Sequence, residues 1–442
     1  MHHLIRQITN LPSQDIRDNN KIFSFLPYRK GAKEFDFDAV GCSVLSCLMR
    51  REIKRNYTFD KYKAECLDRI KEKLSDVSVL REIEAMYFTD RTIATTAPDF
   101  MLIRSEGAEN ASTKHLMSLF SGFCRGRSSQ IKFESGTNFI EKIFLDILNK
   151  NLREASGVES DECYLPFVAD CFYRDIEFLS RHPDYFLQQL SSCIELYTFI
   201  YCTQLGLNIR NWTDGEAPGS KPLYFILDTE KASNERSNLV KSGYQSVARP
   251  MAEVFPILST LEHFNNDGKS PKAPLWAFAK ALRNASKPEQ QTAFVALTRF
   301  ADEFRKKRAL SAFPQVPTTA IEAMEQVIGY GIRQFAEGTG RFRVQVQYME
   351  VFDQEVAKNF IQARGRAGKV LVVNQDFVLL LTNLSVGDRK SVRFKELLAE
   401  FRSRGFWFDK NSQQALITFY ERVGNIDRMS DSGDAVYVRS TI

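Results

Sequence analysis

Long apolar stretches are missing from this chain of 442 residues. A membrane-spanning helix needs about 18–20 consecutive apolar residues, and the best candidate, residues 193–202, is short and contains Glu195. The first residues also lack the charged and then apolar pattern of a secretory signal. The sequence therefore predicts a cytoplasmic protein that does not cross or bind a membrane.

Residues that build metal sites are scarce or badly spaced. The chain has 5 histidines, and none of its 8 cysteines belongs to a C-x-x-C pair. Structural zinc sites need closely spaced cysteines with histidine partners. The cysteines sit mostly among apolar residues, at positions 42, 47, 66, 124, 163, 171, 193 and 202. We therefore expect reduced core cysteines, no metal and no other cofactor.

Common nucleotide-binding and hydrolase motifs are also missing. We find no G-x-x-x-x-G-K-[ST] loop, G-x-G-x-x-G turn, H-E-x-x-H or G-x-S-x-G. A metal-dependent nuclease is an alternative hypothesis, since "YFILDTEK" (224–231) and "APDFMLIRSEG" (97–107) place acids beside apolar runs. Neither segment has the acid-x-Lys strand that would make this hypothesis specific. The sequence thus favours a chain without catalytic residues of its own.

What the chain does contain is helical periodicity. Amphipathic helices are expected at 137–148, 183–206 and 288–310, and strands at 222–227 and 341–351. A polar break at 211–222 and the Gly/Arg-rich linker "ARGRAGK" (363–369) divide the chain. We expect a mainly α-helical protein with a helical domain at 1–210, a mostly helical region with minor strands at 211–357, and a linker with a C-terminal domain at 358–442.

The C-terminal domain shows three helical patterns followed by a hairpin. Apolar residues recur at i, i+3, i+4 and i+7 from Phe377, from Phe394 and from Leu416. Ser412 is a plausible cap for the third helix, and Gly424 its stop. Residues 425–442 alternate like two strands around a Ser/Asp/Gly turn. This order predicts a winged helix, a variant of the helix-turn-helix.

Charge and polarity favour a DNA contact at this domain. Residues 358–442 contain 14 basic and 9 acidic residues, which is the whole net charge of +5. The third helix of such a domain often enters the major groove, so we expect DNA contacts from its outer face, the preceding turn and the wing. The candidates are Lys410, Asn411, Gln414, Thr418, Arg422, Arg402, Arg404, Arg428 and Arg439.

Two observations leave alternatives open. The wing tip "SDSGD" (430–434) is acidic and would repel phosphate, so the domain could instead dock on protein. A second basic loop, with Arg125, Arg127 and Lys132, precedes the helix at 137, whose N-terminal amides could help to bind a phosphate. A solvated loop is the simpler interpretation of that segment.

The end of the chain resembles a known family. The segments "VLLLTNLSVGDRKSVRF" (378–394) and "FKELLAEFRSRGFWFDKNSQQALITFYERVGNIDRMSDSGDAVYVRSTI" (394–442) are similar to the C-terminus of DptG, a DNA phosphorothioation-dependent restriction protein. "FLPYRKG" (25–31) and "YFILDTEKAS" (224–233) fit more weakly. The resemblance implies a subunit of a bacterial anti-phage defence complex that acts with an ATPase and a translocase- or helicase-like subunit. It implies no catalytic residue here, and a scaffold that binds only these partners is the alternative to a DNA-binding adaptor.

Overall fold

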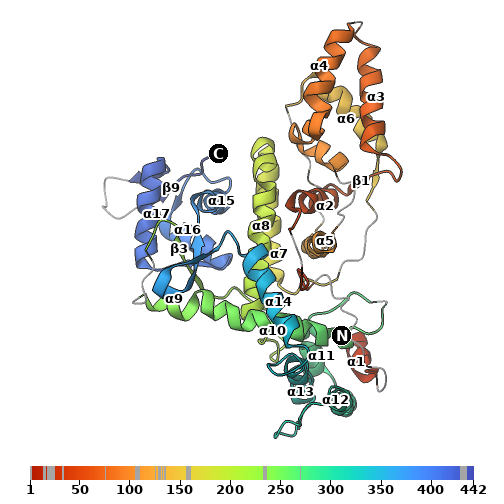
Figure 1. Cartoon of the computed structure of the whole chain (residues 1–442), viewed down its shortest axis with the longest axis vertical. Helices are drawn as coiled ribbons and strands as arrows, with labels where there is room; N and C mark the ends of the chain where they lie inside the picture. The colour runs from red at the N-terminus through yellow and green to blue at the C-terminus, as the bar shows by residue number, and fades with distance from the viewer. Residues whose placement is uncertain are drawn as a thin grey trace.

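A computed structural model gives the fold of the chain (Figure 1). It describes residues 2–12, 16, 25–31, 34–74, 76–104, 110–124, 126–127, 131, 133, 136–155, 161–231, 236–268, 270–428 and 436–442. Helices make up 63% of the described residues and strands 7%, which confirms the expected mainly helical class. Within the described part of the chain, no helix has the length and apolarity to cross a membrane.

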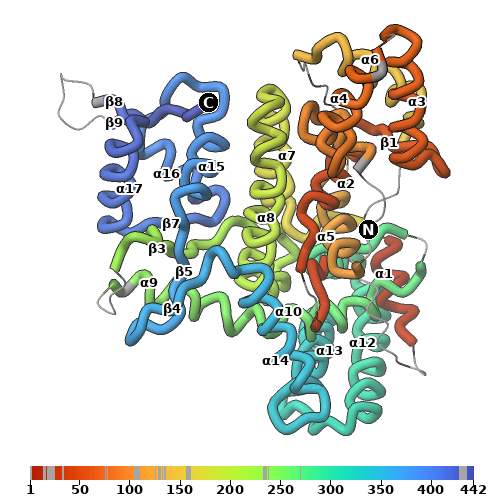
Figure 2. Tube along the Cα trace, turned by 45° about the horizontal axis from the view of Figure 1, so that its top comes forward, coloured from red at the N-terminus to blue at the C-terminus, as the bar shows by residue number. Residues whose placement is uncertain are grey.

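Helix α8 (Pro183–Asn208) runs through the middle of the molecule beside α7 (Pro166–Ser180) (Figures 1 and 2). Each helix begins with proline, whose fixed φ and missing N–H suit the first turn. A helix that is apolar on all sides must be buried on all sides. In α8 the residues from Leu196 to Gly206 are all buried, so the helix predicted at 183–206 is the central core element.

On one side of α8 lie α2 (Phe37–Met49) and α5 (Ala111–Phe123). Beyond them, α3 (Phe59–Lys71), α4 (Val77–Phe88), α6 (Phe139–Asn151) and the 3-10 segments η1 (Thr89–Thr95) and η2 (Pro98–Arg104) enclose a separate small core around Phe144. The chain first enters this unit after β1 (Arg51–Ile53) and last leaves it before β2 (Leu152–Glu154), and these two strands pair as an antiparallel ribbon. Between η2 and α6 the chain passes through α5, outside the unit.

A second group of helices lies below α8 in Figure 1. It comprises α9 (Ser237–Ser242), α10 (Tyr244–Phe264), α11 (Leu275–Asn284), α12 (Lys287–Lys307), α13 (Ala320–Arg333), α14 (Phe342–Val351) and the π-helical turn η3 (Phe352–Val356). The first helix of the chain, α1 (His2–Thr9), packs on α11 and α12. The N-terminal helix is therefore packed against this second group of helices.

Two small sheets organise the remaining part. The first has the order β4 (Ile361–Ala363), β5 (Lys369–Val373), β3 (Leu223–Leu227), β7 (Phe406–Phe408), and β5, β3 and β7 run parallel. The second is antiparallel, with the order β6 (Val392–Arg393), β9 (Val436–Val438), β8 (Ile426–Arg428). Because β3 lies between β5 and β7, the expected middle and C-terminal regions share one sheet.

Three helices complete this part, namely α15 (Gln375–Val386), α16 (Phe394–Ser403) and α17 (Lys410–Val423). We call residues 375–442 the C-terminal unit. Its three helices were predicted from apolar spacing, and the structure confirms each of them. The strand at 222–227 and the helices at 137–148 and 288–310 are also confirmed as β3, α6 and α12.

Two local predictions are wrong. Residues 341–351 form helix α14 rather than a strand, because Tyr348, Val351 and Phe352 are buried at helical spacing while Val346, part of the apparent alternation, is 39% exposed. Residues 363–369 are not a linker. They form the turn between β4 and β5, including the 3-10 turn η4 (Gly365–Ala367), with Gly365 and Gly368 at positive φ.

Candidate nucleic-acid interface

The outer face of α17 is the exposed polar surface that the sequence predicts. Leu416, Phe419 and Tyr420 are buried, so the opposite face points outward. We call five of its exposed residues the α17 face, namely Lys410, Asn411, Gln414, Thr418 and Arg422; the acidic Glu421 is exposed beside them. Arg422 also lies over the Phe419 ring, with 5.7 Å between the guanidinium carbon and the ring centroid. The structure therefore brings five of the nine predicted DNA-contact residues together on one helix.

The ends of α17 are set by caps. Asp409, not Ser412, is the N-cap, and its side chain accepts a hydrogen bond from the Ser412 N–H at 3.0 Å. Ser412 is instead fully buried, and its hydroxyl donates to the carbonyl of Phe225 in β3 at 3.3 Å. At the other end Gly424 takes φ 76°, as predicted, which is the left-handed conformation that favours glycine.

The hairpin at the end of the chain is partly described. β8 and β9 pair antiparallel, while the acidic tip and the side chain of Arg428 lie outside the described residues. Arg439 forms an ion pair with Asp427 at 3.2 Å and donates to the carbonyl of Gly424 at 3.1 Å. Arg439 is therefore exposed but already paired, which reduces the charge it offers to a phosphate.

The last residues are ordered because a buried asparagine binds them. The side-chain oxygen of Asn383, in α15, accepts hydrogen bonds from the Thr441 N–H at 2.9 Å and from the Ser440 hydroxyl at 3.1 Å. The Asn383 amide donates to the Thr441 hydroxyl at 2.8 Å. The terminal segment thus meets the hydrogen-bonding needs of a buried amide.

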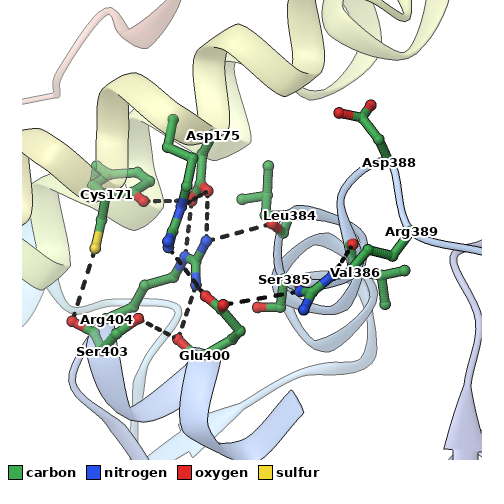
Figure 3. Close-up of polar contacts among 12 residues, drawn as sticks. Cys171, Asp175, Leu384, Ser385, Val386, Asp388, Arg389, Glu400, Ser403 and Arg404 are labelled. Atoms are coloured by element: carbon green, nitrogen blue, oxygen red, sulfur yellow. Dashed lines mark hydrogen bonds and ion pairs between the residues drawn. The ribbon is translucent and has the colours of Figure 1, made fainter. Parts of the chain in front are cut away.

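Arg404 contradicts its predicted role in DNA binding. Its side chain is 1% exposed and forms an ion pair with Asp175 of α7, which is fully buried (Figure 3). The guanidinium donates to both carboxylate oxygens of Asp175, at 2.9 and 2.5 Å, and also to the side chain of Glu400 at 3.1 Å. No N–H of this group can reach a ligand on the surface.

The ion pair keeps Arg404 charged. Burial has the largest single effect and lowers the pKa of the Arg404 guanidinium, but the charge and hydrogen bonds of Asp175, with smaller effects of Tyr197 and Cys171, together outweigh burial and hold the pKa well above its usual value. Asp175 also accepts a hydrogen bond from the hydroxyl of Tyr197 in α8. This network joins the C-terminal unit to both central helices. The local sequence "RSRGFWF" does not indicate this structural role of Arg404, because its partner Asp175 is 229 residues away.

A second polar network attaches α17 to the body. Arg236, before α9, donates to Asp409 at 2.7 Å, to Glu230 at 2.9 Å and to the Ser412 hydroxyl at 2.7 Å. Its side chain is only 9% exposed. Beside this network the Phe406 and Phe225 rings stack, with centroids 4.4 Å apart. The sequence does not indicate this role of Arg236, because Asp409 and Ser412 are 173 and 176 residues away from it.

Arg402, the last candidate of this unit, is half-buried. Its guanidinium carbon lies 4.9 Å from the centroid of the Trp407 ring, a cation–π contact that still leaves N–H groups at the ring edge. Arg402 therefore lies close to the surface, on α16 rather than on α17.

The second basic loop is described only in part. Arg125 and Lys132 lie outside the described residues. Arg127 is paired with Asp170 and lies over the Tyr173 ring. A capping box of Asn138 and Glu141 closes the N-terminus of α6, so the backbone N–H groups of these two residues already have acceptors.

The nuclease hypothesis gains no support from the geometry of its residues. Glu230 accepts the Leu227 N–H and pairs with Arg236, and Lys231 is exposed. Residues 98–104 form a 3-10 segment instead of a strand. In the described part of the chain, no group of three or more His, Cys, Asp or Glu residues is arranged to hold a metal ion.

Comparisons with known proteins do not assign the chain to a family. No family model matches it, and a search of curated proteins found no similar sequence. Function is therefore inferred from the residues and their arrangement.

Proposed function

We propose that this protein is a non-catalytic DNA-binding and adaptor subunit of a bacterial phosphorothioation-dependent restriction complex. Its C-terminal unit acts as a winged helix, and the α17 face contacts duplex DNA. The ATPase and the translocase- or helicase-like activity belong to partner subunits, as the resemblance to the DptG family implies. The exposed α17 face is the observation that carries this proposal. It contains three amide or hydroxyl side chains and two cations, Lys410 and Arg422, that form no ion pair with another described residue, although Glu421 is exposed beside them.

The order of elements supports a winged helix. From α15 to β9 the chain runs helix, strand, helix, helix, strand, strand, apart from the short β7 before α17. The three-stranded sheet has its first strand beside its last, in the order β6-β9-β8. In such domains the third helix approaches the major groove, where Asn and Gln can pair with adenine and Arg with guanine or phosphate.

DNA binding by the full-length protein tests the proposal. A labelled duplex should bind with an affinity that falls as salt rises, because each neutralised phosphate contributes about −0.9 to the slope of log K against log salt. Lys410→Ala and Arg422→Ala should each make this slope less steep by about that amount. Lys287→Ala, which removes an exposed lysine of α12, is the matched control and should change nothing.

The scaffold alternative predicts different results for the same two variants. If the α17 face docks on a partner subunit, both substitutions should reduce co-purification of that subunit, and the wild-type protein should show no salt-dependent DNA binding. That pair of results would contradict the DNA-binding proposal.

A further inference from the structure

A polar pocket of about 370 Å³ opens at the β1–β2 ribbon, between the small helical unit and α2. We call it the arginine pocket. Its lining residues are Arg50, Arg51, Asn149, Leu152, Arg153 and Glu154. The ribbon lies on the opposite side of α7 and α8 from α17 in both views (Figures 1 and 2). This pocket is therefore separate from the α17 face.

Positive charge predominates in the pocket. Three arginines line it against one acid, Glu154. Arg153 is partly neutralised by Glu52, whose carboxylate is 2.8 Å away. Asp99 is also close to Arg51: burial raises the pKa of the Asp99 carboxyl, and the charge of Arg51 lowers it by a smaller amount. The exposed side chains of Lys54, Arg55 and Lys150 flank the ribbon and add three further cations.

The guanidinium groups keep donors for a ligand. Arg50 donates to the Arg127 carbonyl at 3.0 Å and Arg51 to the Asn149 side chain at 2.9 Å. Arginine carries five N–H donors, so most donors of Arg50 and Arg51 have no acceptor among the described residues. The Nε of Arg153 is buried and has no hydrogen-bond partner among the described residues. Buried polar atoms without partners are uncommon in folded proteins and call for an explanation.

The backbone of Arg50 gives an independent indication. Arg50 follows α2 with φ 53° and ψ 36°, the left-handed region, and its N–H bonds the Cys47 carbonyl at 3.3 Å. Glycine or asparagine is usual at this position after a helix, because other side chains are disfavoured there. An arginine held in this unfavourable conformation at the edge of a cationic pocket fits a binding role better than a structural one.

We propose that the arginine pocket binds a phosphate of a nucleic-acid backbone and is a second DNA contact of this protein. Guanidinium groups suit this ligand because their paired N–H donors match two phosphate oxygens. Asn149 can donate to a third oxygen. The assignment rests on the proposed function, since it names a further contact to the same duplex, but it uses residues on the other side of the central helices.

Arg50→Gly gives a clean test of the pocket. Glycine suits the left-handed backbone, so the variant should melt no lower than the wild type while lacking the guanidinium. Arg50→Asn, which also tolerates this conformation, and Arg51→Gln are second variants. Binding of a labelled random-sequence duplex to the full-length protein is measured across a salt series. Arg343→Gln, at an exposed arginine of α14, is the control.

Each pocket variant should make the salt slope less steep by about 0.9. The drop in affinity between about 50 and 200 mM salt should then shrink by roughly 3.5-fold, with no change in sequence preference. Unchanged slopes in a protein that still responds to Arg422→Ala would overturn the pocket and leave the α17 proposal standing. A response to Arg50→Gly alone would keep the pocket and remove the α17 contact.

Two further outcomes would also overturn the assignment. Absence of duplex binding by the wild type would end both proposals. Arg50-dependent binding to phosphatidylglycerol vesicles, with unaltered DNA slopes, would mean that the pocket takes lipid phosphates instead.

Discussion

Replacing Asp175 by alanine should loosen the C-terminal unit from the central helices. The substitution leaves the Arg404 guanidinium 1% exposed, with the partly exposed carboxylate of Glu400 as its remaining acidic partner. It also removes the acceptor of the Tyr197 hydroxyl. Breaking a buried ion pair by removing one member costs about 3–5 kcal/mol, because the other charge stays buried. Both groups are almost fully buried, so solvent screening does not reduce this figure.

The cost converts into a measurable melting temperature. With about 2.1 cal/mol/K of unfolding entropy per residue, cooperative unfolding of all 442 residues has an entropy near ~0.9 kcal/mol/K. A loss of about 3–5 kcal/mol then lowers Tm by about 3–5 °C. If the C-terminal unit separates first, a new transition should instead appear below the main one. Calorimetry distinguishes these cases, and limited proteolysis should cut the variant between α14 and α17 earlier.

A polar-to-apolar replacement provides the control. In the triple variant Asp175→Leu, Tyr197→Phe, Arg404→Met, no buried charge or hydroxyl of this network is left unpaired. Such replacements are often neutral or stabilising, so much of the lost stability should return. If Asp175→Ala melts within about 1 °C of the wild type, or if the triple variant is less stable than the single one, the buried pair does not hold the unit in place.

Three more predictions concern the surroundings of this junction and the N-terminal core. Gly405→Ala should be strongly destabilising in a melting experiment, because φ is +90° there and the added Cβ would lie 2.4 Å from the Gln204 amide nitrogen. Burial raises the pKa of Asp409, but the hydrogen bond and charge of Arg236 have the larger combined effect with the backbone N–H groups of the cap, so the net pKa lies below the ordinary value. The stability that the Asp409 carboxylate contributes should therefore be complete above about pH 4 and lost below it. Asp409→Asn keeps the cap and should make the stability of the protein less dependent on pH in this acid range. Burial and then the Arg29 charge lower the pKa of His115 to about 4, so stability should fall as pH drops from about 6.5 to about 4, and His115→Gln should remove this dependence.

Local periodicity explains which parts of the fold could be predicted. The apolar residues of α15, α16 and α17 repeat at helical spacing, and the faces that these residues form are the faces buried against the core. Even Gly424 was predicted correctly, because a left-handed stop needs a residue without a Cβ. In α14 the same kind of argument failed, since its residues satisfy both a strand and a helix pattern and only the neighbours of Tyr348 decide between them.

Long-range pairing explains what could not be predicted. The segment between α16 and α17 has no periodicity long enough to predict an element, yet Phe406–Phe408 forms a strand because β3 supplies its partner. From the sequence alone, the charge of Arg404 likewise predicts a side chain that contacts solvent or phosphate. Only the fold shows that Asp175 lies beside it. A basic residue between two helices is exposed in most local contexts, and the acid that allows Arg404 to be buried, Asp175, is 229 residues away.

The anchored ends of α17 determine how its exposed face can act. The N-terminal turn is held by Arg236, through Asp409 and Ser412, and Ser412 also binds the carbonyl of Phe225. After its C-terminal end the chain continues into β8 and β9, whose last residues are bound by Asn383. A helix fixed in this way presents Lys410 and Arg422 at a constant separation and direction. Binding to it costs little ordering of the backbone, so affinity at this surface depends on how well the spacing of its side chains matches the ligand.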